Sequence, residues 1–229
     1  MTSLQEKFDL VRQRIALQCG RSGRDPASVA LLAVSKTFSS GAVAQAWAAG
    51  QRAFGENYIQ EGVDKILACR AQGCEGIQWH CIGPIQSNKT RLVATHFDWV
   101  HTVDRLKIAQ RLSEQRPPGM GLLQICIQVN IDGGANKAGV APADALALAR
   151  QVAALPGLRL RGLMAIPEPA PDYAAALAVH QASHALWEQL RAAGLDLDTL
   201  SLGMSADLEA AIAAGSTLVR VGSAVFGAR

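Results

Sequence analysis

The segment Leu31-Leu32-Ala33-Val34-Ser35-Lys36-Thr37 decides the fold that the sequence predicts. Four apolar residues followed by Ser35 and Lys36 are typical of a fully buried strand in a parallel sheet, with an amine at its carboxyl end. Burying an ammonium group without a partner is costly, whereas a neutral amine in a dry pocket is a nucleophile towards carbonyl compounds. On this segment alone, a lysine that reaches back to solvent is the simpler interpretation. The rest of the chain changes that balance.

Strand-like and helix-like segments alternate along the whole chain. Strands are predicted at residues 31–36, 52–58, 77–83, 99–103, 122–129, 158–166, 199–202 and 217–221. Helices are predicted at residues 40–49, 59–72, 87–95, 104–115, 142–154, 172–193 and 206–214, with an extra helix over residues 3–18 before the first strand. This order predicts an α/β fold with a parallel sheet, closed into a single-domain (β/α)8 TIM-type barrel that spans residues 1–229.

The main alternative is a doubly wound open sheet. That fold usually has a glycine-rich dinucleotide turn after its first strand. The chain instead continues as Ser35-Lys36-Thr37-Phe38-Ser39, which contains no glycine. The barrel is therefore favoured.

Composition excludes several classes of protein. The chain has 229 residues, of which 49% are hydrophobic and 18% charged, as in an ordinary globular domain. A net charge of +3 and the lack of a basic run give no indication of nucleic-acid binding. The N-terminal segment lacks the apolar core of a signal peptide, and no segment is apolar enough to span a membrane. We therefore expect a cytoplasmic protein.

Cysteine and histidine spacing gives little indication of a metal site. The five cysteines form no C-x-x-C pair, so we expect reduced and mostly buried thiols at Cys19, Cys69, Cys74, Cys81 and Cys126. His180 and His184 have the spacing of metal ligands on a helix. Because no third ligand is suggested nearby, we expect these two histidines on an exposed helix face.

Polar residues and glycines concentrate where the predicted strands end. In a barrel, the carboxyl ends of the strands form the functional face. Each of these residues alone could be an ordinary turn or cap residue, but that interpretation predicts no bias towards one end of the strands. The set comprises Lys36, Glu56, Asn57, His80, Gly83, Asn130, Met164, Ser201, Met204, Ser205, Arg220, Gly222 and Ser223.

Two of these strand ends are typical of phosphate binding. They are Ser201-Leu202-Gly203-Met204-Ser205-Ala206-Asp207 and Val219-Arg220-Val221-Gly222-Ser223. Barrels commonly bind phosphate with the loops after the seventh and eighth strands, although Ser205 could also be a simple helix N-cap. A phosphate site opposite a strand-end lysine indicates a phosphorylated carbonyl compound, and pyridoxal 5′-phosphate fits that description.

The sequence resembles the family of pyridoxal-phosphate homeostasis proteins. The segments that carry the resemblance run in order over nearly the whole chain, namely residues 32–37, 54–58, 79–89, 162–167, 202–207 and 215–222. The resemblance implies a barrel like the N-terminal domain of bacterial alanine racemase, without that enzyme's second domain. It also implies pyridoxal 5′-phosphate as the cofactor.

The same resemblance implies roles for individual residues. Lys36 would form the internal aldimine, Asn57 would lie near the cofactor, and Arg220 would face the pyridine nitrogen. A guanidinium cannot accept a proton, so this nitrogen should stay neutral. Phosphate contacts would come from Ser205, Gly222 and Ser223. The strand-end residues Met164, Ser201 and Met204 complete the expected cofactor-binding set.

One departure from the family pattern lies in the loop from Asn130 to Gly139. Gly134 stands where the family usually has an acidic residue, which affects the contacts of this loop more than the cofactor site. The loop also carries Lys137. The roles of Lys137 and of Lys89, two amines that could react with an aldehyde, are left open.

Three functions fit this sequence. The first is a protein without catalytic activity that holds pyridoxal 5′-phosphate and delivers it to apo-enzymes, which is compatible with a monomer. The second is an amino-acid racemase of weak activity, which would need a second proton carrier besides Lys36; Tyr58 and Tyr173 are the only tyrosines. The third is a phosphosugar enzyme that uses Lys36 without a cofactor, where Arg220 has no evident task. We favour the first.

Overall fold

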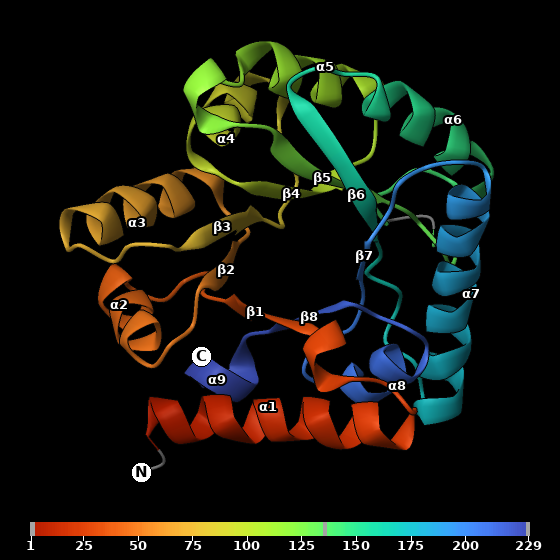
Figure 1. Ribbon diagram of the computed structural model, residues 1–229, viewed down its shortest axis with the longest axis horizontal. Helices are drawn as coiled ribbons and strands as arrows, with labels where there is room; N and C mark the ends of the chain where they lie inside the picture. The colour runs from red at the N-terminus through yellow and green to blue at the C-terminus, as the bar shows by residue number, and fades with distance from the viewer. Residues whose placement is uncertain (1–2, 135–136, 228–229) are drawn as a thin grey trace.

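The chain forms a closed barrel of parallel strands surrounded by helices. The structure is a computed structural model, and it describes residues 3–134 and 137–227. Each strand pairs with the next one along the chain, and β8 (Leu218–Val221) pairs with β1 (Ala30–Val34) to close the ring. The closing register runs from Ala30 opposite Leu218 to Ala33 opposite Val221. The predicted barrel is therefore confirmed (Figure 1).

The other elements follow the predicted order with small changes in their ends. The strands are β2 (Ala53–Glu56), β3 (Gln78–Cys81), β4 (Trp99–Val103), β5 (Leu123–Gln128), β6 (Leu158–Met164) and β7 (Thr199–Ser201). The helices are α1 (Leu4–Arg21), α2 (Ser40–Ala48), α3 (Ile59–Ala71), α4 (Thr90–His96), α5 (Leu106–Gln115), α6 (Pro142–Ala153), α7 (Tyr173–Ala192), α8 (Leu208–Ala213) and α9 (Ser223–Phe226).

The extra helix α1 begins with a capping box. Ser3 Oγ accepts from the Glu6 backbone N–H at 3.2 Å, and Glu6 Oε2 accepts from the Ser3 backbone N–H at 2.6 Å. The apolar face of α1 buries Phe8, Val11 and Ile15. The helix contacts α8 and α9, and it lies beside them in Figure 1. It therefore covers the part of the barrel where β8 meets β1.

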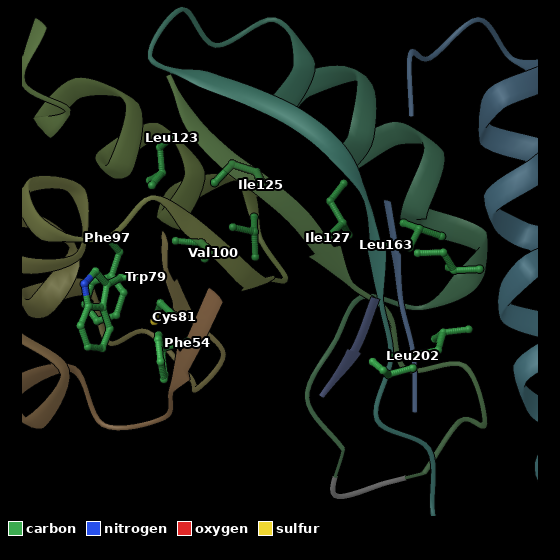
Figure 2. Close-up of a cluster of buried hydrophobic side chains, with 14 of the residues drawn as sticks. Phe54, Trp79, Cys81, Phe97, Val100, Leu123, Ile125, Ile127, Leu163 and Leu202 are labelled. Carbon is green, nitrogen blue, oxygen red and sulfur yellow. The ribbon is translucent and has the colours of Figure 1, made fainter. Parts of the chain in front are cut away.

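The main hydrophobic core lies between the strands and the surrounding helices. Along β5, Leu123, Ile125 and Ile127 belong to this core, while the residues between them point the other way. Figure 2 shows these side chains along one side of the strand, and it shows Phe54, Trp79 and Phe97 gathered together near β2 and β3. This core fixes the strands and leaves the barrel interior for other residues.

Several predicted features differ in the structure. The strand carrying Lys36 ends at Val34, so the lysine stands in the following turn and is half-buried. The helix after β7 begins at Leu208, so Ser205 does not cap it, and the short helix α9 was not predicted. His180 is fully buried rather than on an exposed face, because its Nε2 pairs with Asp207 Oδ2 at 2.9 Å.

All five cysteines are free and buried. Over the ranges that the structure describes, no group of three or more His, Cys, Asp or Glu side chains is arranged to hold a metal ion. In the same ranges, none of the helices is both long and apolar enough to cross a membrane.

Candidate functional site

A cavity of about 420 Å³ lies at the carboxyl ends of the strands. Its size is ordinary for a small-molecule site. Polar lining comes mainly from the neighbouring strands β7, β8, β1 and β2, because the segments that follow them meet at this end of the barrel. The lining residues are Val34, Lys36, Phe38, Asn57, Ile82, Ile166, Met204, Ser205, Ala206, Arg220, Gly222, Ser223 and Gly227.

Most of the expected site residues are in this lining, and two are not. Lys36, Asn57, Met204, Ser205, Arg220, Gly222 and Ser223 all line the cavity. Met164 instead packs with Trp99 and Cys126 in a small buried cluster, and Ser201 is completely buried behind Arg220. The apolar wall residues Phe38, Ile82 and Ile166 were missed, because an apolar residue after a strand carries no distinguishing signal in the sequence.

The turn that carries Met204 and Ser205 is held from two directions. Asp207 Oδ1 accepts from the Met204 backbone N–H at 2.7 Å, while Asp207 Oδ2 pairs with the buried His180. From the other side, Arg14 on α1 donates to the Ser205 carbonyl at 3.1 Å. The N-terminal helix therefore contributes directly to the position of this turn.

The turn also lies next to the end of β8. The Arg220 backbone N–H donates to the Gly203 carbonyl at 3.0 Å, and the Ser223 and Ser205 hydroxyls lie 3.4 Å apart. Two hydroxyl groups from different strand ends thus converge at one end of the cavity. Hydroxyls are donors that suit phosphate oxygens.

Asn57 is fixed by the close approach of Gly83. A Cβ at Gly83 would lie only 1.9 Å from the Asn57 carbonyl oxygen, so no other residue fits there. The side-chain oxygen of Asn57 is buried, and none of the described residues donates to it. A buried acceptor without a partner is costly unless a ligand or water donates to it. The part of the cavity wall formed by Asn57 is therefore suited to a polar ligand group.

Arg220 projects into the barrel interior rather than to the rim. Its Nη1 donates to both the carbonyl and the hydroxyl of Ser201 at 2.7 Å, and its Nη2 donates to the Ala165 carbonyl at 3.0 Å. No carboxylate lies within salt-bridge distance of it among the residues that the structure describes. Burial lowers the pKa of Arg220 to about 10, so it stays protonated at neutral pH.

Behind Arg220 runs a chain of buried hydrogen bonds. Ser201 Oγ lies 3.0 Å from His101 Nδ1, and His101 Nε2 lies 2.9 Å from His80 Nδ1. Because arginine can only donate, the Ser201 hydroxyl accepts from Arg220 and is free to donate to His101 Nδ1. We therefore assign the His101 ring proton to Nε2, which donates to His80 Nδ1. This series of hydrogen bonds between neutral groups then orients Arg220. The sequence singled out Arg220, Ser201 and His80 as strand-end residues. It gave no sign that His101 connects them, because the four residues come from four different strands.

Both histidines must remain neutral in the folded protein. Burial lowers the pKa of His80 to about 3, and burial together with the neighbouring His80 and Arg220 lowers the pKa of His101 well below its usual value. Between pH 6.5 and 5, the unfolded chain therefore takes up protons that the folded protein does not. The contribution of the two neutral histidines to stability is present above pH 6.5 and is lost as pH falls below it.

This titration gives a measurable pH dependence. As pH falls from 6.5 to 5, each of the two histidines is expected to lower the unfolding free energy by up to about 1.4 kcal/mol per pH unit. Urea unfolding at several pH values measures the slope. His80→Phe should reduce the slope of unfolding free energy against pH by the contribution of one histidine. The control His184→Gln should leave the contributions of His80 and His101 in place. An unchanged slope in His80→Phe would show that His80 is not held neutral.

Comparisons with known proteins add to this geometry. A family model described as "Alanine racemase, N-terminal domain" matches residues 16–229. The chain is 56% identical over 230 residues to a pyridoxal phosphate homeostasis protein of Pseudomonas aeruginosa, covering 100% of this chain and 97% of that relative. The corresponding protein of Escherichia coli K12 is 52% identical over 229 residues, with 100% and 98% covered.

Solved structures agree in fold. PipY of Synechococcus elongatus, solved with PLP bound, superposes with a TM-score of 0.80 at 38% identity, covering 93% of this chain and 100% of that chain. Alanine racemase from Corynebacterium glutamicum superposes with a TM-score of 0.67 at 17% identity, covering 96% of this chain and 61% of that chain. The second likeness concerns the barrel fold only.

Proposed function

The chain belongs to the family of pyridoxal phosphate homeostasis proteins, and we propose that it holds pyridoxal 5′-phosphate covalently at Lys36. The observation that carries the proposal is the cavity itself, which has an amine, a hydroxyl pair and a buried guanidinium on its walls. These are the groups that an aldehyde, a phosphate and a pyridine nitrogen require. When bound, this cofactor supplies an electron-withdrawing ring and a reactive aldehyde.

Each wall residue has a distinct task in this proposal. Lys36 provides the amine, and the side chains of Val34, Ile82 and Ile166 form an apolar part of the same cavity wall. Ser205 and Ser223, whose hydroxyls lie 3.4 Å apart, would hold the phosphate by donating hydrogen bonds to it. Arg220 would donate a hydrogen bond to the ring nitrogen. Because a guanidinium cannot accept a hydrogen bond from a protonated pyridine N–H, the nitrogen would stay neutral and the ring would be a weak electron sink. Such a site suits storage of the cofactor better than transamination.

We propose a holder and carrier rather than a racemase. The described lining contains no tyrosine, histidine, cysteine or carboxylate that could act as a second proton carrier opposite Lys36. Tyr58 and Tyr173 are both more than half exposed and do not line the cavity. We extend the proposal to delivery of the held cofactor to apo-enzymes, as the names of the relatives suggest.

The phosphate contacts provide the test. We expect the double variant Ser205→Ala/Ser223→Ala to bind pyridoxal 5′-phosphate at least tenfold more weakly, because hydrogen bonds to a charged group are each worth roughly 1.5–3 kcal/mol. Binding of pyridoxal, which lacks the phosphate, should change by less than about twofold. Absorbance titration of the purified protein measures both. Equal weakening for the two ligands would contradict the assigned phosphate end.

A matched control is available away from the cavity. Ser113→Ala, on α5 and away from the cavity, should leave both affinities unchanged. If the double variant binds both ligands as the wild type does, the phosphate lies elsewhere and the proposed orientation is wrong.

A further inference from the structure

The residue after Lys36 has an unusual backbone. Thr37 has φ of 68°, and it is the only non-glycine residue with positive φ in the ranges 3–134 and 137–227. A β-branched side chain makes this left-handed region costly. Thr37 is exposed, so close packing does not impose the conformation. Strain of this kind persists only where other contacts hold it.

The contact that holds Thr37 comes from helix α3. Glu61 Oε1 accepts from the Thr37 backbone N–H at 2.5 Å. The same oxygen accepts from Lys65 Nζ at 2.6 Å, one turn further along the helix. The carboxylate is therefore fixed between a buried ammonium and the turn that follows Lys36.

Lys65 also holds the residue before Lys36. Its Nζ donates to the Ser35 carbonyl at 2.7 Å and to the Glu56 carboxylate at 2.9 and 3.0 Å. Ser35 Oγ donates to the same carboxylate at 2.5 Å. An ammonium has three protons, and Ser35, Glu56 and Glu61 use all three. The peptide groups on both sides of Lys36 are thus tied to one buried cluster.

We propose that Ser35, Glu56, Glu61 and Lys65, here called the anchor cluster, are positioning residues for the Lys36 amine. None of them lines the cavity, so they act through the backbone. A purely structural ion pair would need only Lys65 and Glu56. The additional carboxylate of Glu61 holds the Thr37 backbone in its left-handed conformation, and this is the contact that a positioning role requires. This inference rests on the proposed function, in which Lys36 is the cofactor's anchor.

Glu61 offers the sharpest test, because its side chain is partly exposed and its loss leaves the Lys65–Glu56 pair intact. In Glu61→Ala, the addition of pyridoxal 5′-phosphate to Lys36 should slow by roughly tenfold, since the turn can relax out of the left-handed region. Stopped-flow absorbance gives the rate. Borohydride trapping with peptide mass spectrometry gives the share of label at Lys36 against Lys89.

A second substitution separates positioning from stability. Glycine adopts positive φ readily. The double variant Glu61→Ala/Thr37→Gly should therefore add the cofactor at least about threefold faster than Glu61→Ala alone, although the carboxylate is still missing. Glu61→Gln keeps an acceptor for the Thr37 N–H and should remain closer to the wild type than Glu61→Ala. Asp64→Asn is the matched control, because Asp64 is exposed on the same helix and accepts from Gln60 Nε2.

The outcomes are distinguishable. Slower addition in Glu61→Ala with recovery by Thr37→Gly supports the positioning role. A lower melting temperature with an unchanged rate, or a slower rate that Thr37→Gly does not recover, overturns it. If the wild type carries no label on Lys36, the proposed function fails instead.

Discussion

Lys36→Ala is expected to abolish covalent binding of pyridoxal 5′-phosphate while leaving the barrel folded. Lys36 is the only lysine among the described lining residues of the cavity. It is half-buried, and it forms no ion pair with any residue in the ranges 3–134 and 137–227. Its truncation should therefore change the unfolding free energy by no more than about 0.5 kcal/mol.

Absorbance of the amine–aldehyde adduct measures the effect of Lys36→Ala. Binding that remains should be noncovalent, carried by the phosphate end of the cavity. Lys89→Ala serves as the control, since Lys89 lies outside the lining residues. An adduct of wild-type intensity in Lys36→Ala would assign the reactive amine to another lysine.

Lys65→Met is expected to have the largest effect on stability. Glu56 is 1% exposed, and the substitution leaves its carboxylate buried without the ammonium partner. Removing one partner of a buried ion pair costs about 3–5 kcal/mol. Urea unfolding at pH 7.5 should show a loss of this size. Lys107→Met, an exposed lysine on α5, should change stability by less than about 0.5 kcal/mol.

The loss in Lys65→Met should depend on pH. Burial raises the pKa of Glu56 above its usual value, although Ser35 and Lys65 oppose the shift. Without Lys65 the carboxyl group binds a proton more readily in the folded protein than in the unfolded chain. The deficit is therefore largest above the raised pKa and shrinks as pH falls towards 4.5. Adding Glu56→Gln should recover much of the deficit at pH 7.5, and failure to do so would contradict this cause.

The barrel could be predicted because its signals are local. Each buried strand is an apolar run, each helix has its own periodicity, and their alternation leaves few topologies. The strand of Lys36 ended earlier than predicted, because a serine and a lysine at a strand end do not show where pairing stops. Helix α9, four residues long, carries too little periodicity to be found.

The cavity was partly predictable for a related reason. Residues that follow parallel strands gather at one face of a barrel, which brought Lys36, Asn57, Ser205 and Ser223 together. The same rule could not tell how deep a residue lies, so Met164 and Ser201 were expected in the wall and lie outside it.

Contacts between distant segments could not be predicted at all. The series of hydrogen bonds that links Arg220 to His80 through Ser201 and His101 exists only because the barrel brings together strands that are far apart in the sequence. The tie between Glu61 and Thr37 depends on a backbone angle that no residue type at that position indicates.

The most direct measurement is borohydride reduction of the protein loaded with pyridoxal 5′-phosphate, followed by peptide mass spectrometry. The chain has lysines at positions 7, 36, 65, 89, 107 and 137, so the reduced adduct identifies the reactive amine. We expect a single adduct, on Lys36. No adduct, or label spread over Lys89, Lys137 and the other lysines, would contradict Lys36 as the anchor of the cofactor.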